Sequence, residues 1–222
     1  MALLRTSTSV RILVEGLCLA GKTTLTQALA TGPGTTRVPE YADLTQLPPW
    51  PPQDVAAARQ GLAYLTAVEE KRHEWAAASG TAAVVFDRGP LTLVAHEVAM
   101  SALNVPADPH YAARLCSRFP APHAIVYLDV DDDEAIAREQ RRGALPAHLV
   151  APEVRAVLRS YYERALGWTD DRRVLRLSGS APLTDLVLAV RTYLHNLPQG
   201  PLGRWLLPET ASHCTDPMER PQ

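Results

Sequence analysis

Lysine is nearly absent from this chain of 222 residues, which contains only Lys22 and Lys71. Arginine therefore supplies almost all of the positive charge, and the formal net charge is -2. A chain without a surplus of positive charge cannot neutralise the phosphates of a nucleic acid backbone or an anionic membrane surface. We therefore expect neither nucleic acid nor a membrane as a main partner.

Cysteines and long apolar runs are also scarce. The three cysteines, Cys18, Cys116 and Cys214, are odd in number and show no C-x-x-C spacing. We therefore expect reduced thiols and no zinc site. No segment approaches the ~18 consecutive apolar residues of a membrane-spanning helix, and no cationic start with an apolar run marks a signal peptide. These absences predict a cytoplasmic protein.

Apolar residues make up 46% of the chain, which is enough to fill the core of one α/β domain. Proline is abundant, with 19 residues, and is dense around residues 47–52 and beyond residue 197. We predict a single domain over residues 1–197, followed by a Pro-rich C-terminal tail over residues 198–222.

The most specific pattern in the chain is a complete G-x-x-x-x-G-K-T string at residues 16–23. Residues 11–15 before it are predicted to form a short buried strand, and residues 24–30 after it the start of a helix. In this context, backbone N–H groups and the helix N-terminus form a site for a triphosphate. Lys22 is expected to reach the β- and γ-phosphates, and the Thr23 hydroxyl to bind Mg²⁺. The residues predicted to bind the nucleotide are Gly16, Cys18, Leu19, Ala20, Gly21, Lys22, Thr23 and Thr24.

Apolar runs alternate with helical patterns along the rest of the chain. The runs at 81–86 and 124–129 predict strands that are buried on both faces, with further strands at 36–41 and 174–177. Helices are predicted over residues 54–79, 91–103, 109–118, 132–142, 151–166 and 182–197. This alternation implies right-handed crossovers and a parallel sheet covered by helices on both sides.

Charged residues follow two of these strands, at the edge of the sheet where open α/β proteins bind ligands. Asp87 and Arg88 end a strand that we expect beside the phosphate-loop strand. Asp87 is a candidate Mg²⁺ ligand or base, and Arg88 a candidate for holding the transferred phosphoryl group or the acceptor. The alternative is a structural role, as part of a buried ion pair or as a cap at the end of the strand.

Glu40 lies in the acidic loop in which the second predicted strand, at residues 36–41, ends. An alcohol acceptor must lose its proton, for which Glu40 is a candidate base. A phosphate acceptor is already ionised and needs no base. Glu40 therefore bears on which reaction occurs, and the alternative is a solvated loop carboxylate.

Arg138, Arg141 and Arg142 lie at the end of a predicted helix, next to a stretch that contains Gly143 and Pro146. We predict an arginine-bearing lid at about residues 138–150, in which Arg138 and Arg142 stabilise the charge on the transferring group. The alternative is a solvated helical face, on which Glu134 could pair with Arg138.

These motifs together resemble the thymidylate kinase and deoxynucleoside kinase group of P-loop kinases. The resemblance covers residues 11–197 and includes the Glu15-Gly16 entry to the phosphate loop, Asp87-Arg88 and the arginine lid. It implies a three-layer P-loop NTPase fold with a five-stranded parallel sheet, ATP with Mg²⁺ as the phosphoryl donor, and a nucleoside-like acceptor. Kinases of this group are often dimers, so the resemblance is compatible with a homodimer, while the sequence itself leaves the oligomeric state open.

The sequence departs from both branches of this group. Cys18 stands where thymidylate kinases carry an acidic residue in the phosphate loop, and their Arg-Glu-Pro-Gly-Gly stretch is absent. Glu40, with Trp50 after it, is similar to the base and following tryptophan of deoxynucleoside kinases, which favours a hydroxyl acceptor. The Asp87-Arg88 pair is closer to the thymidylate kinase form.

Three functions follow from this reading. We prefer an ATP-dependent kinase that transfers the γ-phosphoryl group to a hydroxyl of a nucleoside or nucleoside-like molecule, including an antibiotic or its precursor. Either Glu40 or Asp87 would be its base. The second is a thymidylate-kinase-like nucleoside monophosphate kinase. The third is a nucleotide-binding regulator or GTPase switch, which is disfavoured because neither Asn104 nor Asn196 begins an Asn-Lys-x-Asp string.

Overall fold

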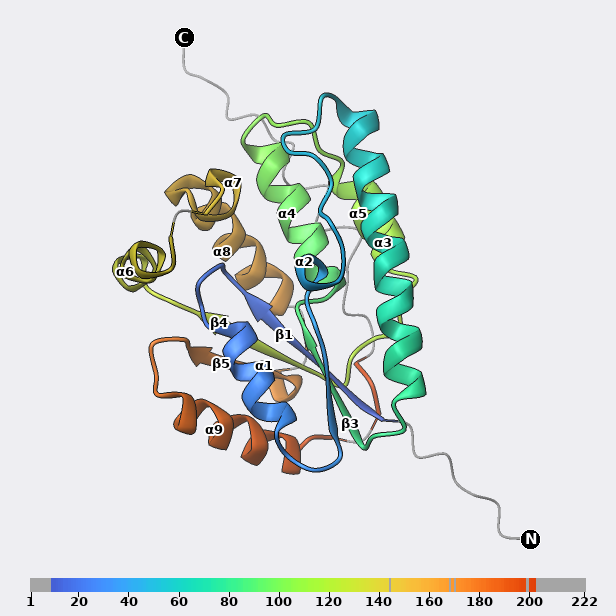
Figure 1. Cartoon of the computed structure of the whole chain (residues 1–222), viewed down its shortest axis with the longest axis vertical. Helices are drawn as coiled ribbons and strands as arrows, with labels where there is room; N and C mark the ends of the chain where they lie inside the picture. Colours follow the sequence, from blue (N-terminus) through green and yellow to red (C-terminus); the bar gives the residue numbers. More distant parts are fainter. Residues whose placement is uncertain (1–8, 144, 168, 170, 199, 203–222) are drawn as a thin grey trace, which may run out of the picture.

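The computed structural model describes residues 9–143, 145–167, 169, 171–198 and 200–202 (Figure 1). Its strands are β1 (Val10–Gly16), β2 (Thr35–Val38), β3 (Ala83–Asp87), β4 (Ala124–Asp129) and β5 (Val174–Ser178). Its helices are α1 (Lys22–Ala30), α2 (Tyr41–Leu44), α3 (Val55–Ala78), α4 (Pro90–Ala102), α5 (Pro109–Cys116), α6 (Asp132–Arg142), α7 (Ala147–Val150), α8 (Pro152–Gly167), the short 3₁₀ turn η1 (Asp171–Arg173) and α9 (Leu183–His195). None of the described helices is long and apolar enough to cross a membrane.

The strands form one parallel sheet in the order β2-β3-β1-β4-β5, which confirms the predicted parallel sheet. β1 lies at the centre, where Val14 is in register with Asp87 of β3 and Val126 of β4. From β1 the chain passes to the edge strand β2, returns to β3 and then crosses β1 to reach β4, so the connections after β1 and β3 run in opposite directions and the carboxyl ends of these two strands form a topological switch point. Open α/β sheets bind their ligands at such a point.

Side chains of β1 alternate between two helical layers, because successive residues of a strand point to opposite faces. Ile12 and Val14 pack with residues of α1 and α9, whereas Leu13 packs with residues of α3, α4, α5 and α8. All three side chains are buried, and each contributes about 1.5–3 kcal/mol to folding. The predicted three-layer architecture is thus confirmed (Figure 1).

The second strand is shorter than the sequence pattern predicts. β2 ends at Val38 rather than continuing to residue 41, since Pro39 has no N–H to donate to a sheet. Tyr41 instead begins the short helix α2, and Glu40 is its N-cap residue. The Glu40 side chain makes no capping hydrogen bond, which leaves it available for other partners.

Most of the predicted C-terminal tail lies outside the described residues. The last described residue, Leu202, is buried, and its N–H donates to the carbonyl of Pro122 (2.7 Å). The chain beyond residue 197 therefore packs against the domain at least at this point.

Candidate active site

The phosphate loop joins the end of β1 to the start of α1, as the motif predicts. Gly16 has a φ of 132°, and a Cβ atom at this position would lie 1.9 Å from the carbonyl oxygen of Leu128. Gly21, which precedes the first helical residue, has a left-handed φ of 92°. Both positions therefore require glycine, since other residues would be strained or would clash with β4.

Lys22 is buried at the base of this loop, and its Nζ donates to the carbonyl of Leu17. Burial, followed by the repulsion of Arg88, lowers the pKa of Lys22 to about 8. Among the described residues, no carboxylate forms an ion pair with Lys22. An anionic phosphate in the loop would supply the missing counter-charge.

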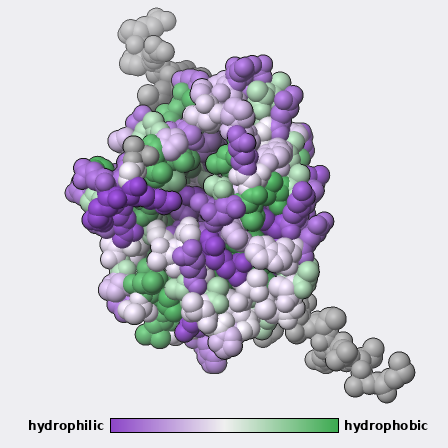
Figure 2. Space-filling model, viewed as in Figure 1, coloured by the Kyte–Doolittle hydropathy of each residue, from purple (hydrophilic) through white to green (hydrophobic). Residues whose placement is uncertain are grey.

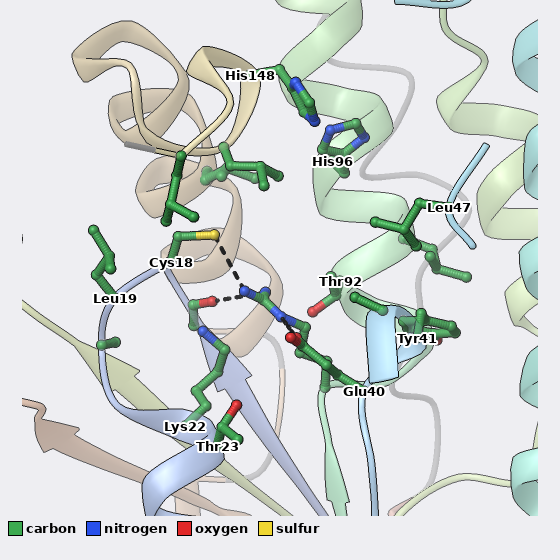
Figure 3. Close-up of a pocket in the computed structure, with 18 of the residues that line it drawn as sticks. Cys18, Leu19, Lys22, Thr23, Glu40, Tyr41, Leu47, Thr92, His96 and His148 are labelled. Carbon is green, nitrogen blue, oxygen red and sulfur yellow. Dashed lines mark hydrogen bonds and ion pairs between the residues drawn. The ribbon is translucent and has the colours of Figure 1, made fainter. Parts of the chain in front are cut away.

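Arg88 and Glu40 form an ion pair beside the phosphate loop, with Arg88 Nε 2.9 Å from Glu40 Oε2. The guanidinium also approaches the loop itself, with Nη2 3.3 Å from Cys18 Sγ and Nη1 3.5 Å from the Gly16 carbonyl. Figure 3 shows these contacts as dashed lines between Glu40 and the loop. Arg88 thus lies between a carboxylate and the predicted phosphate site.

Asp87 has partners different from those of its neighbour Arg88. Its carboxylate is fully buried, and Oδ2 accepts from Arg37 Nη2 (2.7 Å) and from the Thr26 hydroxyl (3.3 Å). The other oxygen, Oδ1, is buried and has no hydrogen-bond partner among the described residues. Asp87 therefore forms a buried ion pair with Arg37 and not with Arg88, and one oxygen of Asp87 is left for another partner.

A cavity of about 800 Å³ opens at this end of the sheet. In Figure 2 it is a hollow in the facing surface, with strongly hydrophilic residues of α6 on its left rim. The predicted site residues that line it are Gly16, Cys18, Leu19, Ala20, Gly21, Lys22, Thr23, Thr24, Glu40, Arg88, Arg138 and Arg142. Asp87 is the one predicted site residue that does not line it. The fold therefore brings together residues that are separated by more than 100 positions in the sequence.

Arg138 is bound more firmly than the lid prediction implies. Its Nη1 donates to the Leu19 carbonyl (2.9 Å), its Nη2 to the Gly179 carbonyl (2.8 Å), and its Nε to Glu134 (2.7 Å). The predicted Glu134–Arg138 pair is thus present. Arg138 connects α6 to the phosphate loop and to the turn after β5, whereas Arg142 is exposed at the rim of the cavity.

Trp50, which the family resemblance pointed to, lies in the cavity beside His96 and His148, two histidines that we did not single out from the sequence. Trp50 lies with its ring centroid 4.0 Å from that of His148 and 5.2 Å from that of His96. Burial, followed by the repulsion of His148, lowers the pKa of His96 to about 4, so His96 is uncharged at neutral pH. Helix α3 also lines the cavity with aliphatic side chains and a glycine, namely Ala57, Ala58, Gly61, Leu62 and Leu65.

Glu15, the last residue before the phosphate loop glycine, is fully buried. Its Oε2 accepts from the hydroxyls of Thr92 and Tyr162, which both line the cavity, and Oε1 has no partner among the described residues. Burial raises the pKa of Glu15 to about 7. The signal for this residue in the sequence is an acidic side chain directly after the apolar run Ile12-Leu13-Val14.

This buried acid makes folding stability depend on pH. The folded pKa of about 7 exceeds the usual 4.5, so stability is lost as the pH rises from 4.5 to 7. One pKa unit corresponds to ~1.4 kcal/mol, so the full loss is about 3 kcal/mol. We expect Glu15→Gln, which stays neutral, to raise the melting temperature by several degrees more at pH 8 than at pH 5. Thermal unfolding followed by circular dichroism measures the difference in melting temperature between variant and wild type at each pH. An equal increase at pH 5 and pH 8 would contradict a raised pKa for Glu15.

Comparisons with known proteins bear on the fold of this chain. The sequence profile of the AAA domain family matches residues 11–166. No curated protein matches the chain. Similar solved structures are those of a deoxyadenosine kinase from M. mycoides, with the products dCMP and a flexible dCDP, with dCTP, or with dATP bound.

These structures superimpose with TM-scores of 0.66, 0.65 and 0.66, at 17%, 15% and 17% sequence identity. The alignments cover 84–85% of this chain and 100% of the other chains. At these identities the likeness concerns the fold, which is therefore the P-loop NTPase fold that the sequence predicts.

Proposed function

The chain belongs to the AAA domain family, and from this membership and its fold we propose that it is an ATP-dependent kinase. It would transfer the γ-phosphoryl group to a hydroxyl of a nucleoside or nucleoside-like small molecule. The observation that carries this proposal is the Glu40–Arg88 pair, which lines the same cavity as the phosphate loop. Transfer of a phosphoryl group to a hydroxyl requires a base that accepts the hydroxyl proton and a fixed cation beside the phosphate site.

The donor nucleotide would lie against the loop at residues 16–23, with Lys22 at its β- and γ-phosphates. Mg²⁺ fits two groups here: the Thr23 hydroxyl, which lines the cavity, and Asp87, whose buried Oδ1 has no partner among the described residues. When bound, the ion would neutralise charge on the β- and γ-phosphates.

Glu40 would accept the proton of the acceptor hydroxyl, because its carboxylate lines the cavity and is paired with Arg88. Asp87 is less suited to this role, since it is fully buried and bound to Arg37. Arg88, together with Lys22, would meet the negative charge on the transferring phosphoryl group. Of the two predicted lid arginines, Arg142 lies at the rim of the cavity and would approach the transferring phosphoryl group. Arg138 would instead support the phosphate loop, because it donates to the Leu19 carbonyl.

The acceptor end of the cavity suits a planar, uncharged ring. Helix α3 presents an aliphatic wall to the cavity, and His96 is uncharged at neutral pH. A phosphate monoester would also bring its charge against the Glu40 carboxylate, which disfavours a monophosphate acceptor. The similarity in fold to a deoxyadenosine kinase supports a nucleoside-like acceptor.

A screen of ATP consumption tests this proposal. Nucleosides, deoxynucleosides, their monophosphates, and nucleoside and aminoglycoside antibiotics are each added to the protein with Mg²⁺ and ATP in a coupled assay. We expect hydroxyl acceptors to stimulate ATP consumption and monophosphates to leave it at the background rate. Stimulation by monophosphates alone would establish the thymidylate-kinase-like alternative instead. Tight GTP binding without transfer to any acceptor would favour a regulator.

A further inference from the structure

Arg72 on α3 is a buried cation outside the cavity, with a side chain that is 1% exposed. It forms an ion pair with Glu69 one turn earlier in the helix, and its guanidinium lies over the ring of Tyr41, 4.5 Å from the centroid. A buried charge is costly unless it is both paired and hydrogen-bonded. The groups that pair with and hydrogen-bond the Arg72 guanidinium therefore show which parts of the fold this side chain holds in place.

Two of these contacts are made to the backbone of the candidate active site. Arg72 Nη2 donates to the carbonyl of Asp87 (3.0 Å) and to that of Arg88 (2.8 Å). Arg88 has a φ of 62°, a left-handed conformation that non-glycine residues rarely adopt. The Arg88 N–H continues the sheet by donating to the Val14 carbonyl of β1 (3.0 Å), whereas its own carbonyl lies between β3 and α4 and accepts from Arg72. Arg72 thus binds the turn in the conformation that directs Arg88 towards Glu40.

The same guanidinium also contacts the other half of the pair. Tyr41, whose ring it covers, directly follows Glu40 in the chain. Tyr41 is itself buried, so the start of α2 is held between Arg72 and the core. One side chain on α3 therefore contacts both segments that carry the Glu40–Arg88 ion pair, while it lies outside the cavity.

We propose that Arg72 is a positioning residue that sets the separation of Glu40 and Arg88, an inference that rests on the kinase function proposed above. A displacement of about 1 Å in such a pair is enough to reduce turnover by ~10²-fold. Arg72 makes no direct contact with the phosphate loop, so we expect its loss to affect kcat more than the KM for ATP.

The experiment compares Arg72→Met, which removes the charge and the donors, with Arg72→Lys, which keeps the charge and loses the forked geometry. The control is Arg155→Met, because Arg155 is a buried arginine on α8 that pairs with Asp132 and donates to the Val130 carbonyl. Two readouts are recorded for each variant that remains folded by thermal unfolding. The first is the Nε–H signal of Arg88 in a ¹H–¹⁵N NMR spectrum, assigned by its loss in Arg88→Lys. The second is kcat and the KM for ATP.

We expect the Arg88 signal to shift or broaden in Arg72→Met, and kcat to fall by about 10–100-fold, with the KM for ATP within about twofold of wild type. Arg72→Lys should fall between Arg72→Met and wild type on both readouts, and Arg155→Met should match wild type. An unchanged Arg88 signal and kcat in folded Arg72→Met would overturn the proposal, as would equal losses in Arg155→Met.

The two proposals fail in distinguishable ways. If Arg72→Met does not fold, Arg72→Lys decides the outcome, because it leaves Glu69 with a charged partner. If the wild-type protein phosphorylates no acceptor, the kinase function is wrong. The NMR signal still decides in that case, because an undisturbed Arg88 signal in the Arg72 variants rejects a positioning role and a displaced one supports it.

Discussion

Replacing Lys22 with alanine is expected to lower kcat by at least ~10²–10³-fold, the usual cost of removing one preorganised donor from a buried charge-stabilising site. Lys22 is buried at the phosphate loop and donates to the Leu17 carbonyl, so its ammonium is already positioned for a phosphate. Burial lowers its pKa to about 8, which means that the fold disfavours this charge when no phosphate is present. The variant should therefore melt at the same temperature as wild type or higher. Steady-state kinetics, thermal unfolding and titration with Mg-ATP measure the three effects.

The chain offers a matched control for this substitution. Lys71 is the only other lysine, and it is exposed on α3. Lys71→Ala should keep kcat within about twofold of wild type, since an exposed charge far from the phosphates contributes little. If Lys22→Ala keeps more than a tenth of wild-type activity, Lys22 has no place in the mechanism. If folded wild-type protein does not bind Mg-ATP, the proposed kinase function itself is wrong.

Glu40→Gln should reduce kcat for a hydroxyl acceptor by ~10²–10⁴-fold, the usual contribution of a general base. The glutamine keeps the size of the side chain, and its carbonyl oxygen can still accept from Arg88 Nε, which now bonds Glu40 Oε2 at 2.9 Å. The KM for ATP should stay within about twofold, because Glu40 is not part of the phosphate loop. This separation of kcat from KM distinguishes a lost base from a distorted cavity.

Glu70→Gln is the control for Glu40→Gln. Glu70 also pairs with an arginine, Arg118 (3.6 Å), but both side chains are more than half exposed and neither lines the cavity. Its removal should leave kcat unchanged. An unchanged rate in Glu40→Gln would mean that Asp87 is the base or that the acceptor is a phosphate. Asp87→Asn then separates these cases. If Asp87 is a magnesium ligand, its loss raises the Mg²⁺ concentration needed for half-maximal activity. If Asp87 is the base, its loss lowers kcat and leaves that Mg²⁺ concentration unchanged.

The sequence was sufficient for the features that depend on neighbouring residues. The phosphate loop is readable because its glycines, Lys22 and Thr23 lie within eight consecutive positions and its chemistry comes mainly from its own backbone. Strands β3 and β4 on either side of β1 are readable because a strand that is buried on both faces carries a continuous apolar run. The site residues at strand ends also follow, since parallel strands end at one edge of the sheet. Together with the predicted lid arginines Arg138 and Arg142, these predictions placed twelve of the residues that line the cavity.

The partners of those residues were decided by the tertiary structure. Asp87 and Arg88 are adjacent in sequence, yet Asp87 binds Arg37, 50 positions away, and Arg88 binds Glu40, 48 positions away. The left-handed backbone of Arg88 sends the two side chains to different partners, and Arg72 on a third element holds that turn. A sequence pattern specifies which face of a strand or helix is apolar, because that depends on local periodicity. It does not specify which distant charges meet, because crossovers, register and side-chain packing together bring them within hydrogen-bond distance.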